Sequence, residues 1–222
     1  MLNGQVILAP NGSRFFDCNA IVSPQAARVF RAAGYAGAIR YVGRHATASY
    51  DIGLREAEGI LAAGLALQLV QHVQNPGWAP SKVLGLGYGT FAAQSAAAIG
   101  YVSGATIWCD LEGVLPGDHA TETIEFCNAW LDQVGHAGFT PGLYVGYECG
   151  LNAVQLYSQL RFEHYWSAYN LNTDNIPAVR GVCMKQHTEQ TLAGIRFDPD
   201  TVQKDALGML PLILAPDGWI AP

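Results

Sequence analysis

The sequence predicts a single α/β domain in which eight strands close into a (β/α)8, TIM-like barrel. Strand-like and helix-like segments alternate with short connections, which is typical of a parallel sheet. About eight strand-like segments fit into 222 residues, which favours a compact closed barrel over an open sheet. The open, doubly wound alternative is weakened because no Gly-x-Gly-x-x-Gly pattern follows the first strand.

The first half of the chain carries three clear strand–helix units. In the first of them, Ser23 is placed to cap a helix, Pro24 occupies the first helical position and Gly34 ends it. Gly64 ends the second helix in the same way. The expected strands are 14–20, 35–43 and 65–73, and the expected helices are 23–34, 53–64 and 89–100.

The second half continues the alternation but with less helix. Strands are expected at 105–113, 141–147, 164–170, 181–188 and 195–202, and helices at 119–138 and 151–160. No helical pattern separates 164–170 from 181–188, so we expect shortened or missing helices in this half. Residues 204–216 are expected to form a closing helix or a tail. No linker or repeat interrupts the chain, which predicts one domain over 1–222.

Composition excludes several classes of protein. Hydrophobic residues make up 50% and charged residues 14% of the chain, which excludes a disordered chain. The net charge is -6 and the basic residues are scattered, which argues against a nucleic-acid partner. The five cysteines form no CxxC pair and have no zinc-ligand spacing with the histidines. They are expected to be buried, reduced thiols, and neither a metal nor a cofactor is expected.

The ends and the uncharged stretch of the chain bear on localisation. The N-terminus lacks a basic segment followed by a long apolar core, so no signal peptide is recognised. Residues 83–109 carry no charge, but their glycines and polar residues favour a helix followed by a strand over a membrane span. We therefore expect synthesis in the cytoplasm and no stable membrane insertion.

The segment TIWCDLEG at 106–113 places two carboxylates at the end of an apolar strand. Side chains alternate across a strand, so Trp108, Asp110 and Glu112 share one face. In a barrel of this kind the functional site lies at the carboxyl ends of the strands. If the other face meets the helices, both carboxylates point into the mouth of the barrel. A solvated loop or a divalent-cation site is the alternative.

Further acidic residues are expected at the same mouth. The same alternation places Asp17 inward on the first strand, although Asp17 could instead cap the following helix. Asp198 and Asp200 lie near the end of the last predicted strand, in a segment that also has turn chemistry. Convergence of several carboxylates raises the pKa of at least one of them by burial and repulsion. One protonated and one ionised carboxyl group is the arrangement used in glycoside hydrolysis.

Five other residues are candidates for substrate binding. Tyr144 lies between two glycines that leave space beside it, Trp166 and Tyr169 could stack on sugar rings, and Gln186 could hydrogen-bond a ligand. Arg40 could balance the carboxylates. Each also has a structural alternative, as a core aromatic residue or as an ordinary surface side chain.

Several segments together resemble a known family. FFDCNA…AAGYAGAIRYVGR, EAEGILAAGLALQLVQ, IWCDLEG, GLYVGY, YWSAYN and FDPDTV occur in the order found in the glycoside-hydrolase-like barrel domains of bacteria and phages. These domains are similar to glycoside hydrolase family 25, the Chalaropsis-type lysozymes. The resemblance extends from about Arg14 to Val202, and the Asp-x-Glu strand is its most specific part.

The resemblance implies a muramidase that cuts the β-1,4 bond between N-acetylmuramic acid and N-acetylglucosamine in peptidoglycan. Glu112 would be the general acid, and Asp110 would stabilise positive charge or orient the substrate's acetamido group. Asp17 and Asp198 would assist, and Tyr144 would hydrogen-bond in the cleft. Such a protein could be a phage endolysin or a delivered antibacterial effector that acts at the cell wall.

The sequence departs from the lysozymes in two places. Asp-Cys-Asn stands where they usually carry Asp-x-Ser, and His187 follows Gln186 where an aromatic residue is common. A catalytically silent barrel that binds glycan or has a structural role is therefore a second hypothesis. A metal-dependent hydrolase that uses the same carboxylates is a third.

Overall fold

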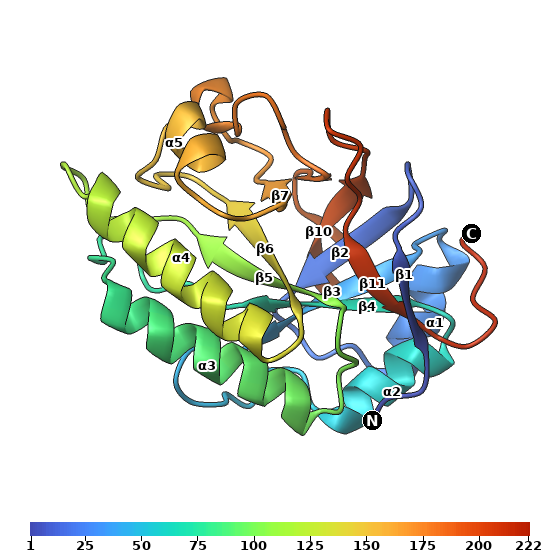
Figure 1. Cartoon of the computed structure of the whole chain (residues 1–222). Coiled ribbons are helices and arrows are strands. Elements are labelled where there is room, and N and C mark those ends of the chain that lie inside the picture. The colour runs from blue at the N-terminus through green and yellow to red at the C-terminus, as the bar shows by residue number, and fades with distance from the viewer.

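The computed structural model describes all 222 residues and has a closed barrel of eight strands at its centre (Figure 1). Pairing between β4 and β5 closes the ring, which confirms the predicted α/β barrel. In the order of their neighbours, its strands are β4 (Ala66–Gln71), β3 (Gly37–Val42), β2 (Arg14–Cys18), β10 (Ile195–Val202), β8 (Met184–Gln186), β7 (His164–Ser167), β6 (Thr140–Val145) and β5 (Thr106–Leu111).

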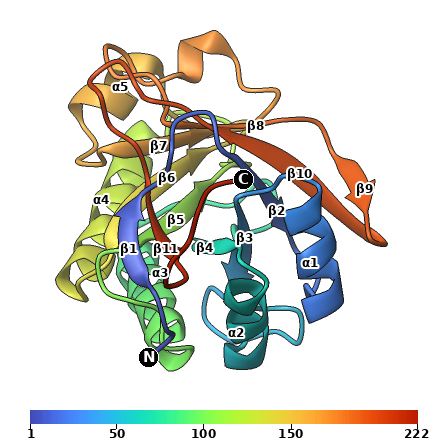
Figure 2. The same cartoon turned by 90° about the vertical axis from the view of Figure 1, so that its right-hand side faces the viewer.

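One barrel strand runs against the others. β10 is antiparallel to both of its neighbours, β2 and β8, whereas the remaining barrel strands pair in parallel. The chain leaves β8 at the mouth, forms the short strand β9 (Gln190–Leu192) and returns along β10 as a hairpin. This hairpin projects beyond the barrel beside α1 (Figure 2). The expectation of a wholly parallel sheet is therefore wrong for the last strand.

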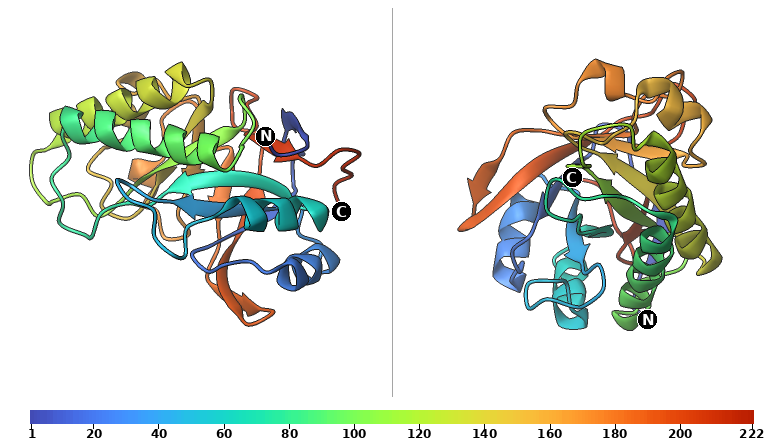
Figure 3. Two further views of the ribbon diagram at one scale, coloured as in Figure 1. Left: turned by 90° about the horizontal axis from the view of Figure 1, so that it is seen from below. Right: turned by 90° about the vertical axis from the view of Figure 1, so that its left-hand side faces the viewer.

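Only some of the barrel strands are followed by a helix along the chain. The helices α1 (Pro24–Ala32), α2 (Leu54–Ala62), α3 (Lys82–Ala98) and α4 (Ala120–His136) lie in two pairs on different sides of the barrel (Figure 3). After β6 there is only the six-residue α5 (Ala153–Ser158), and after β7 only a short 3-10 turn, η1 (Thr173–Asn175). The predicted shortening of the later helices is confirmed.

The third helix begins earlier than the sequence predicts. Its amino-terminal cap is Ser81, whose hydroxyl accepts a hydrogen bond from the Leu84 N–H at 3.3 Å. Two glycines of this helix, Gly85 and Gly89, face α4 at close range. A Cβ atom on Gly89 would lie 2.7 Å from the Trp130 carbonyl oxygen. These glycines therefore allow the two helices to approach each other.

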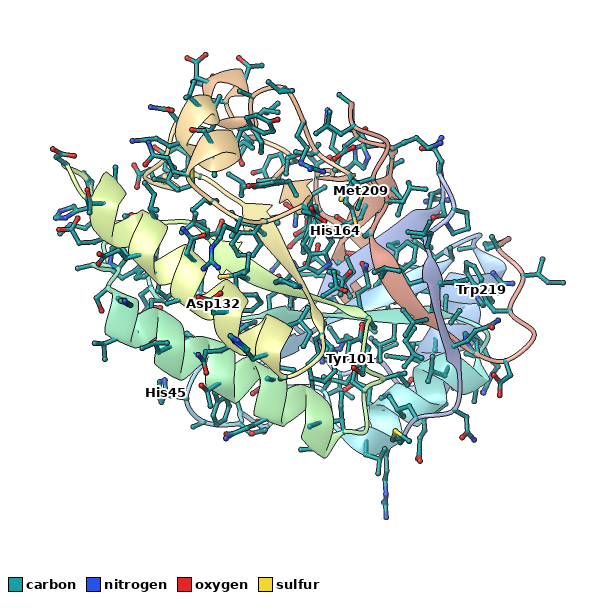
Figure 4. The ribbon with its side chains drawn as sticks, in the orientation of Figure 1. His45, Tyr101, Asp132, His164, Met209 and Trp219 are labelled. Carbon is teal, nitrogen blue, oxygen red and sulfur yellow. The ribbon has the colours of Figure 1, made fainter.

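Residues near both ends of the chain form strands outside the barrel ring. β1 (Gln5–Leu8) pairs antiparallel with β11 (Leu212–Ala215), and β11 pairs with β4 through Leu214 and Leu67. The expectation of a helix or tail at 204–216 is wrong for 212–215. Ile213 and Ala215 are buried with the residues inside the barrel. β11 therefore covers the end of the barrel opposite the mouth. Beyond it, Trp219 donates to the Gly64 carbonyl at 3.0 Å (Figure 4).

The apolar residues form an outer and an inner core. The outer core lies between the strands and helices, and the smaller inner core fills the barrel. All five cysteines are unpaired and buried, as expected. No helix has both the length and the apolar character needed to cross a membrane.

Candidate active site

The strand β5 directs its alternate side chains into the barrel. Trp108 belongs to the inner core, whereas Ile107, Cys109 and Leu111 pack in the outer core against the helices. Asp110 therefore faces inward and is 8% exposed. Glu112 follows the strand by one residue and is partly exposed. The alternation predicted for this segment is confirmed.

Asp17 occupies the same level on β2 and is fixed by neighbouring side chains. The Tyr41 hydroxyl donates to Asp17 Oδ1 at 3.0 Å, and Gln186 Nε2 donates to Oδ2 at 3.0 Å. The Tyr144 hydroxyl in turn donates to Gln186 Oε1 at 3.0 Å. The predicted candidates Asp17, Tyr144 and Gln186 are thus joined in one hydrogen-bonded chain across the mouth.

The two acidic residues of β10 lie at different depths. Asp198 pairs directly with Asp17 across the antiparallel ladder, and Gln186 Nε2 lies 3.5 Å from Asp198 Oδ2. Asp200 is paired with Phe15 and Gln186 and lies deeper, where its Oδ1 accepts from Trp166 Nε1 at 2.8 Å. Because β10 is antiparallel, the start of this strand faces the mouth, and not its end as expected.

Asp110 is buried without a complete set of hydrogen-bond partners. Its Oδ1 atom has no partner in the structure. Burial raises the pKa of Asp110 well above its usual value, and the charges of Glu112 and Asp17 raise it further. A buried carboxylate oxygen without a donor is costly, so it is suited to receive a donor from a ligand.

A hydrogen bond to its backbone anchors Glu112 at the rim. Its carbonyl oxygen accepts from Trp78 Nε1 at 2.8 Å. Partial burial raises the pKa of the side chain. The side chain lies over Gly146, where an added Cβ atom would come within 2.6 Å of the Glu112 Cβ. The glycine beside Tyr144 therefore leaves the space that the Glu112 side chain occupies.

The mouth is acidic, and its carboxylates form no ion pair with a basic side chain. Burial raises the pKa of Asp17 to about 7 and that of Asp198 to about 6. None of the five ion pairs in the structure includes a carboxylate of the mouth. The mouth carboxyl groups therefore keep their protons to higher pH than exposed carboxyl groups do. No group of three or more His, Cys, Asp or Glu side chains is arranged to hold a metal ion.

Two predicted binding residues do not reach the mouth. Arg40 is fully buried on the opposite face of β3, where it pairs with Glu56 at 2.7 Å and donates to the Cys18 carbonyl oxygen. It does not balance the mouth carboxylates. Trp166 is 1% exposed and packs edge-to-face on Tyr144, with 4.5 Å between ring centroids. Its ring is part of the inner core and is not available to a sugar.

Tyr169 remains accessible, and two further aromatic residues adjoin the site. Tyr169 is 54% exposed on the loop after β7. Tyr147 is 61% exposed, and its carbonyl accepts from the Gly113 N–H next to Glu112 at 2.8 Å. Tyr41, which positions Asp17, was missed by the sequence analysis although the alternation of β3 places it inward beside the outward Arg40.

A hollow of about 500 Å³ extends from the mouth toward the projecting hairpin. Asp17, Tyr41 and Asp198 line its inner side, and Glu189 and Arg196 of the hairpin line its outer side. The hairpin therefore forms one wall beside the carboxylates.

Residues 28–202 match the family model described as Rv2525c-like, glycoside hydrolase-like domain. The chain belongs to this family. The match includes β5 with Asp110 and β10 with Asp198, and Asp17 lies just before its start. No protein of curated function gives a significant match to the chain.

Solved structures with the same fold include a secreted protein, a muramidase and an endolysin domain. The Rv2525c-like domain is similar to the Tat-secreted protein Rv2525c of Mycobacterium tuberculosis, solved with L-tartrate, at 19% identity and a TM-score of 0.65 over 86% of this chain and 96% of that one. It is also similar to a muramidase from Trichobolus zukalii at 17% identity and a TM-score of 0.59 over 86% and 93% of the two chains.

The catalytic domain of the endolysin ply40, from bacteriophage P40 of Listeria monocytogenes, is a third similar structure. It has 14% identity and a TM-score of 0.58 over 88% of this chain and 95% of that one. At these identities the likeness shows a shared glycoside-hydrolase-like fold.

Proposed function

We propose that the protein is a glycoside hydrolase of the muramidase type, which cuts the β-1,4 bond between N-acetylmuramic acid and N-acetylglucosamine in peptidoglycan. One observation carries the proposal. Glu112 lies at the rim, two residues after Asp110, which is buried and has a carboxylate oxygen without a hydrogen-bond donor. A silent barrel that binds glycan is the alternative.

Glu112 is the general acid in this proposal. The raised pKa of its carboxyl group favours the protonated form needed to donate to the leaving glycosidic oxygen. Its position at the rim allows contact with a polymer that cannot enter the barrel. The exposed rings of Tyr147 and Tyr169 lie on neighbouring loops and offer surfaces on which sugar rings could stack.

Asp110 orients the acetamido group of the substrate. The N–H of the acetamido group would donate a hydrogen bond to Asp110 Oδ1. This bond would supply the missing partner and stabilise the ionised carboxylate. The acetamido oxygen can then attack the anomeric carbon as an internal nucleophile, so no enzyme carboxylate need attack it. Asp17, whose carboxyl group is held by Tyr41 and Gln186, assists Asp110 together with Asp198.

The fold neighbours support a site of action at the cell wall, where peptidoglycan is found. One of them is a Tat-secreted protein, and others are an endolysin and a muramidase. Phage release and delivery as an antibacterial effector are both compatible with this proposal.

Digestion of purified peptidoglycan tests the proposal. Mass spectrometry of the soluble fragments should show new reducing ends on N-acetylmuramic acid, and the yield should be unchanged by EDTA. Loss of activity with EDTA would instead indicate the metal-dependent hydrolase. Sedimentation of folded protein with peptidoglycan, without release of fragments, would overturn the enzyme and favour the binding module.

A further inference from the structure

A second hollow adjoins the mouth on the side opposite the hairpin. It encloses about 330 Å³ between the loops that follow β2, β3 and β4. Asn19 lines both this hollow and the one beside Asp17, so the two hollows lie on either side of this residue. We call it the Arg44 hollow; its polar lining includes Arg44, His45, Tyr50, Asp51, His72 and Asn75.

The single carboxylate of the Arg44 hollow is already engaged. Asp51 Oδ2 accepts from the Ala48 N–H at 2.6 Å, and Asp51 Oδ1 lies 3.0 Å from His72 Nε2. His72 stacks on Tyr41 with 4.6 Å between ring centroids. Because Tyr41 donates to Asp17, this wall of the hollow is linked to the mouth through Tyr41.

Arg44 is the cation of the hollow, and no carboxylate pairs with it. It donates to the Val73 carbonyl oxygen but takes part in none of the ion pairs. Burial lowers the pKa of His72, so that ring adds little positive charge at neutral pH. Arginine has five N–H donors, so the contact with Val73 leaves donors free for an oxyanion. His45 lies exposed on the same loop (Figure 4).

The two parts of the mouth therefore differ in charge. Carboxyl groups surround the proposed cleavage position. The adjacent hollow is lined by a guanidinium without a carboxylate partner, by several neutral donors and by one carboxylate, Asp51, whose oxygens are engaged by Ala48 and His72. A carboxylate on the substrate is repelled from the first and attracted to the second. Such a difference fixes the direction in which a chain of sugars lies across the mouth.

We infer that the Arg44 hollow is a carboxylate-binding subsite that takes an acidic group of the glycan next to the bond that is cut. The identity of the glycan rests on the proposed function. In peptidoglycan the carboxylate can come from a lactyl ether of muramic acid that carries no peptide, or from a stem peptide. Both sources present the same group to Arg44.

Binding measurements in the Glu112→Gln background test this inference without turnover. Isothermal titration compares three ligands of equal sugar length, namely a peptide-free muramic-acid oligosaccharide, its peptide-bearing form and a chitin oligosaccharide without carboxylates. We expect tighter binding of at least one acidic ligand than of chitin. Arg44→Ala should remove this preference, with a loss of about tenfold to a hundredfold for the acidic ligand, the range for one charge-assisted hydrogen bond.

Matched variants separate charge from structure. Arg44→Lys should retain part of the preference, and His45→Ala, at an exposed side chain, should reduce it with little effect on folding. Arg28→Ala removes an exposed cation from α1 and serves as the charge control, which should bind as the parent does. Circular dichroism establishes that each variant is folded.

The outcomes distinguish this inference from the proposed function. Equal binding of acidic and neutral ligands by the parent overturns the carboxylate subsite even if peptidoglycan is cleaved. A preference that survives in Arg44→Ala overturns the assignment to this hollow. A preference that depends on Arg44, in a protein that cleaves nothing, supports the subsite and rejects the hydrolase. The peptide-free and peptide-bearing ligands identify the source of the carboxylate.

Discussion

Asp17 and Asp198 lie directly opposite each other on the antiparallel strands β2 and β10, and Gln186 Nε2 is 3.0 Å from the first carboxyl group and 3.5 Å from the second. Two carboxyl groups so placed oppose each other's ionisation. The pKa of Asp17 is raised to about 7, by burial first and by the charge of Asp198 as well. The barrel thus keeps protons on its mouth carboxyls at a pH where exposed carboxylates have lost them.

This arrangement predicts that Asp17→Asn stabilises the protein at neutral pH. The pKa of Asp17 is higher in the folded state than its usual value of 3.8, so the folded state binds more protons between pH 3.8 and about 7. The wild-type free energy of unfolding should therefore decrease as pH rises through this window and level off above it. The Asp17→Asn variant lacks this titrating group, so its free energy of unfolding at pH 8 should exceed that of wild type by about 1–3 kcal/mol.

Urea unfolding at several pH values measures this effect. Asp132→Asn, at an exposed carboxylate on α4, is the control and should show no such gain. Identical pH dependence in wild type and Asp17→Asn would contradict the raised pKa.

The rate of glycan cleavage should depend on pH on both sides of an optimum. Burial raises the pKa of Glu112 above its usual value of 4.5, and the rate should fall once the pH exceeds the raised value, because the acid has then lost its proton. It should also fall at lower pH as Asp110 of the substrate complex becomes protonated, because cleavage needs the ionised carboxylate that the acetamido N–H favours. Initial rates on a soluble glycan across this range report both limbs, and a flat profile would argue against a carboxyl acid.

Asp110→Asn tests the role assigned to the acetamido group. The variant should lose rate by about two to four decades, because the neutral amide cannot stabilise the positive charge that develops in the transition state. Wild type should in turn fail to cut peptidoglycan whose muramic acid has been de-N-acetylated. Normal cleavage of that substrate would show that the acetamido group is not the nucleophile.

Gly146→Ala tests whether Glu112 needs the space that Gly146 leaves beside Tyr144. The new Cβ would lie 2.6 Å from the Glu112 Cβ, closer than real Cβ contacts, so the acid must move. We expect a loss of rate of about a hundredfold, the effect of a displacement near 1 Å, with little change in KM for the glycan. Gly135→Ala, with open space around its Cβ on α4, is the matched control. Unchanged activity in Gly146→Ala would place the acid elsewhere.

The sequence predicted the parts of the site that depend on local alternation. A period of two placed Asp17 and Asp110 inward, and the same rule would have placed Tyr41 inward in place of Arg40. Local pattern could not reveal that β10 reverses direction. The turn before it is Ala193–Gly194, where both residues have positive φ, and it lacks the Asn-Gly signal typical of such hairpins. The four residues of β11 were equally ambiguous, because a short apolar run fits helix or strand.

The most direct test of the account compares wild type with Glu112→Gln in the digestion of purified peptidoglycan. The substitution is isosteric, so the protein should fold normally, and the release of fragments should fall by about two to four decades, the usual share of general acid catalysis. Glu122→Gln, at an exposed carboxylate in the first turn of α4, should retain full activity. Equal release of fragments by wild type and Glu112→Gln would contradict the assignment of Glu112 as the acid.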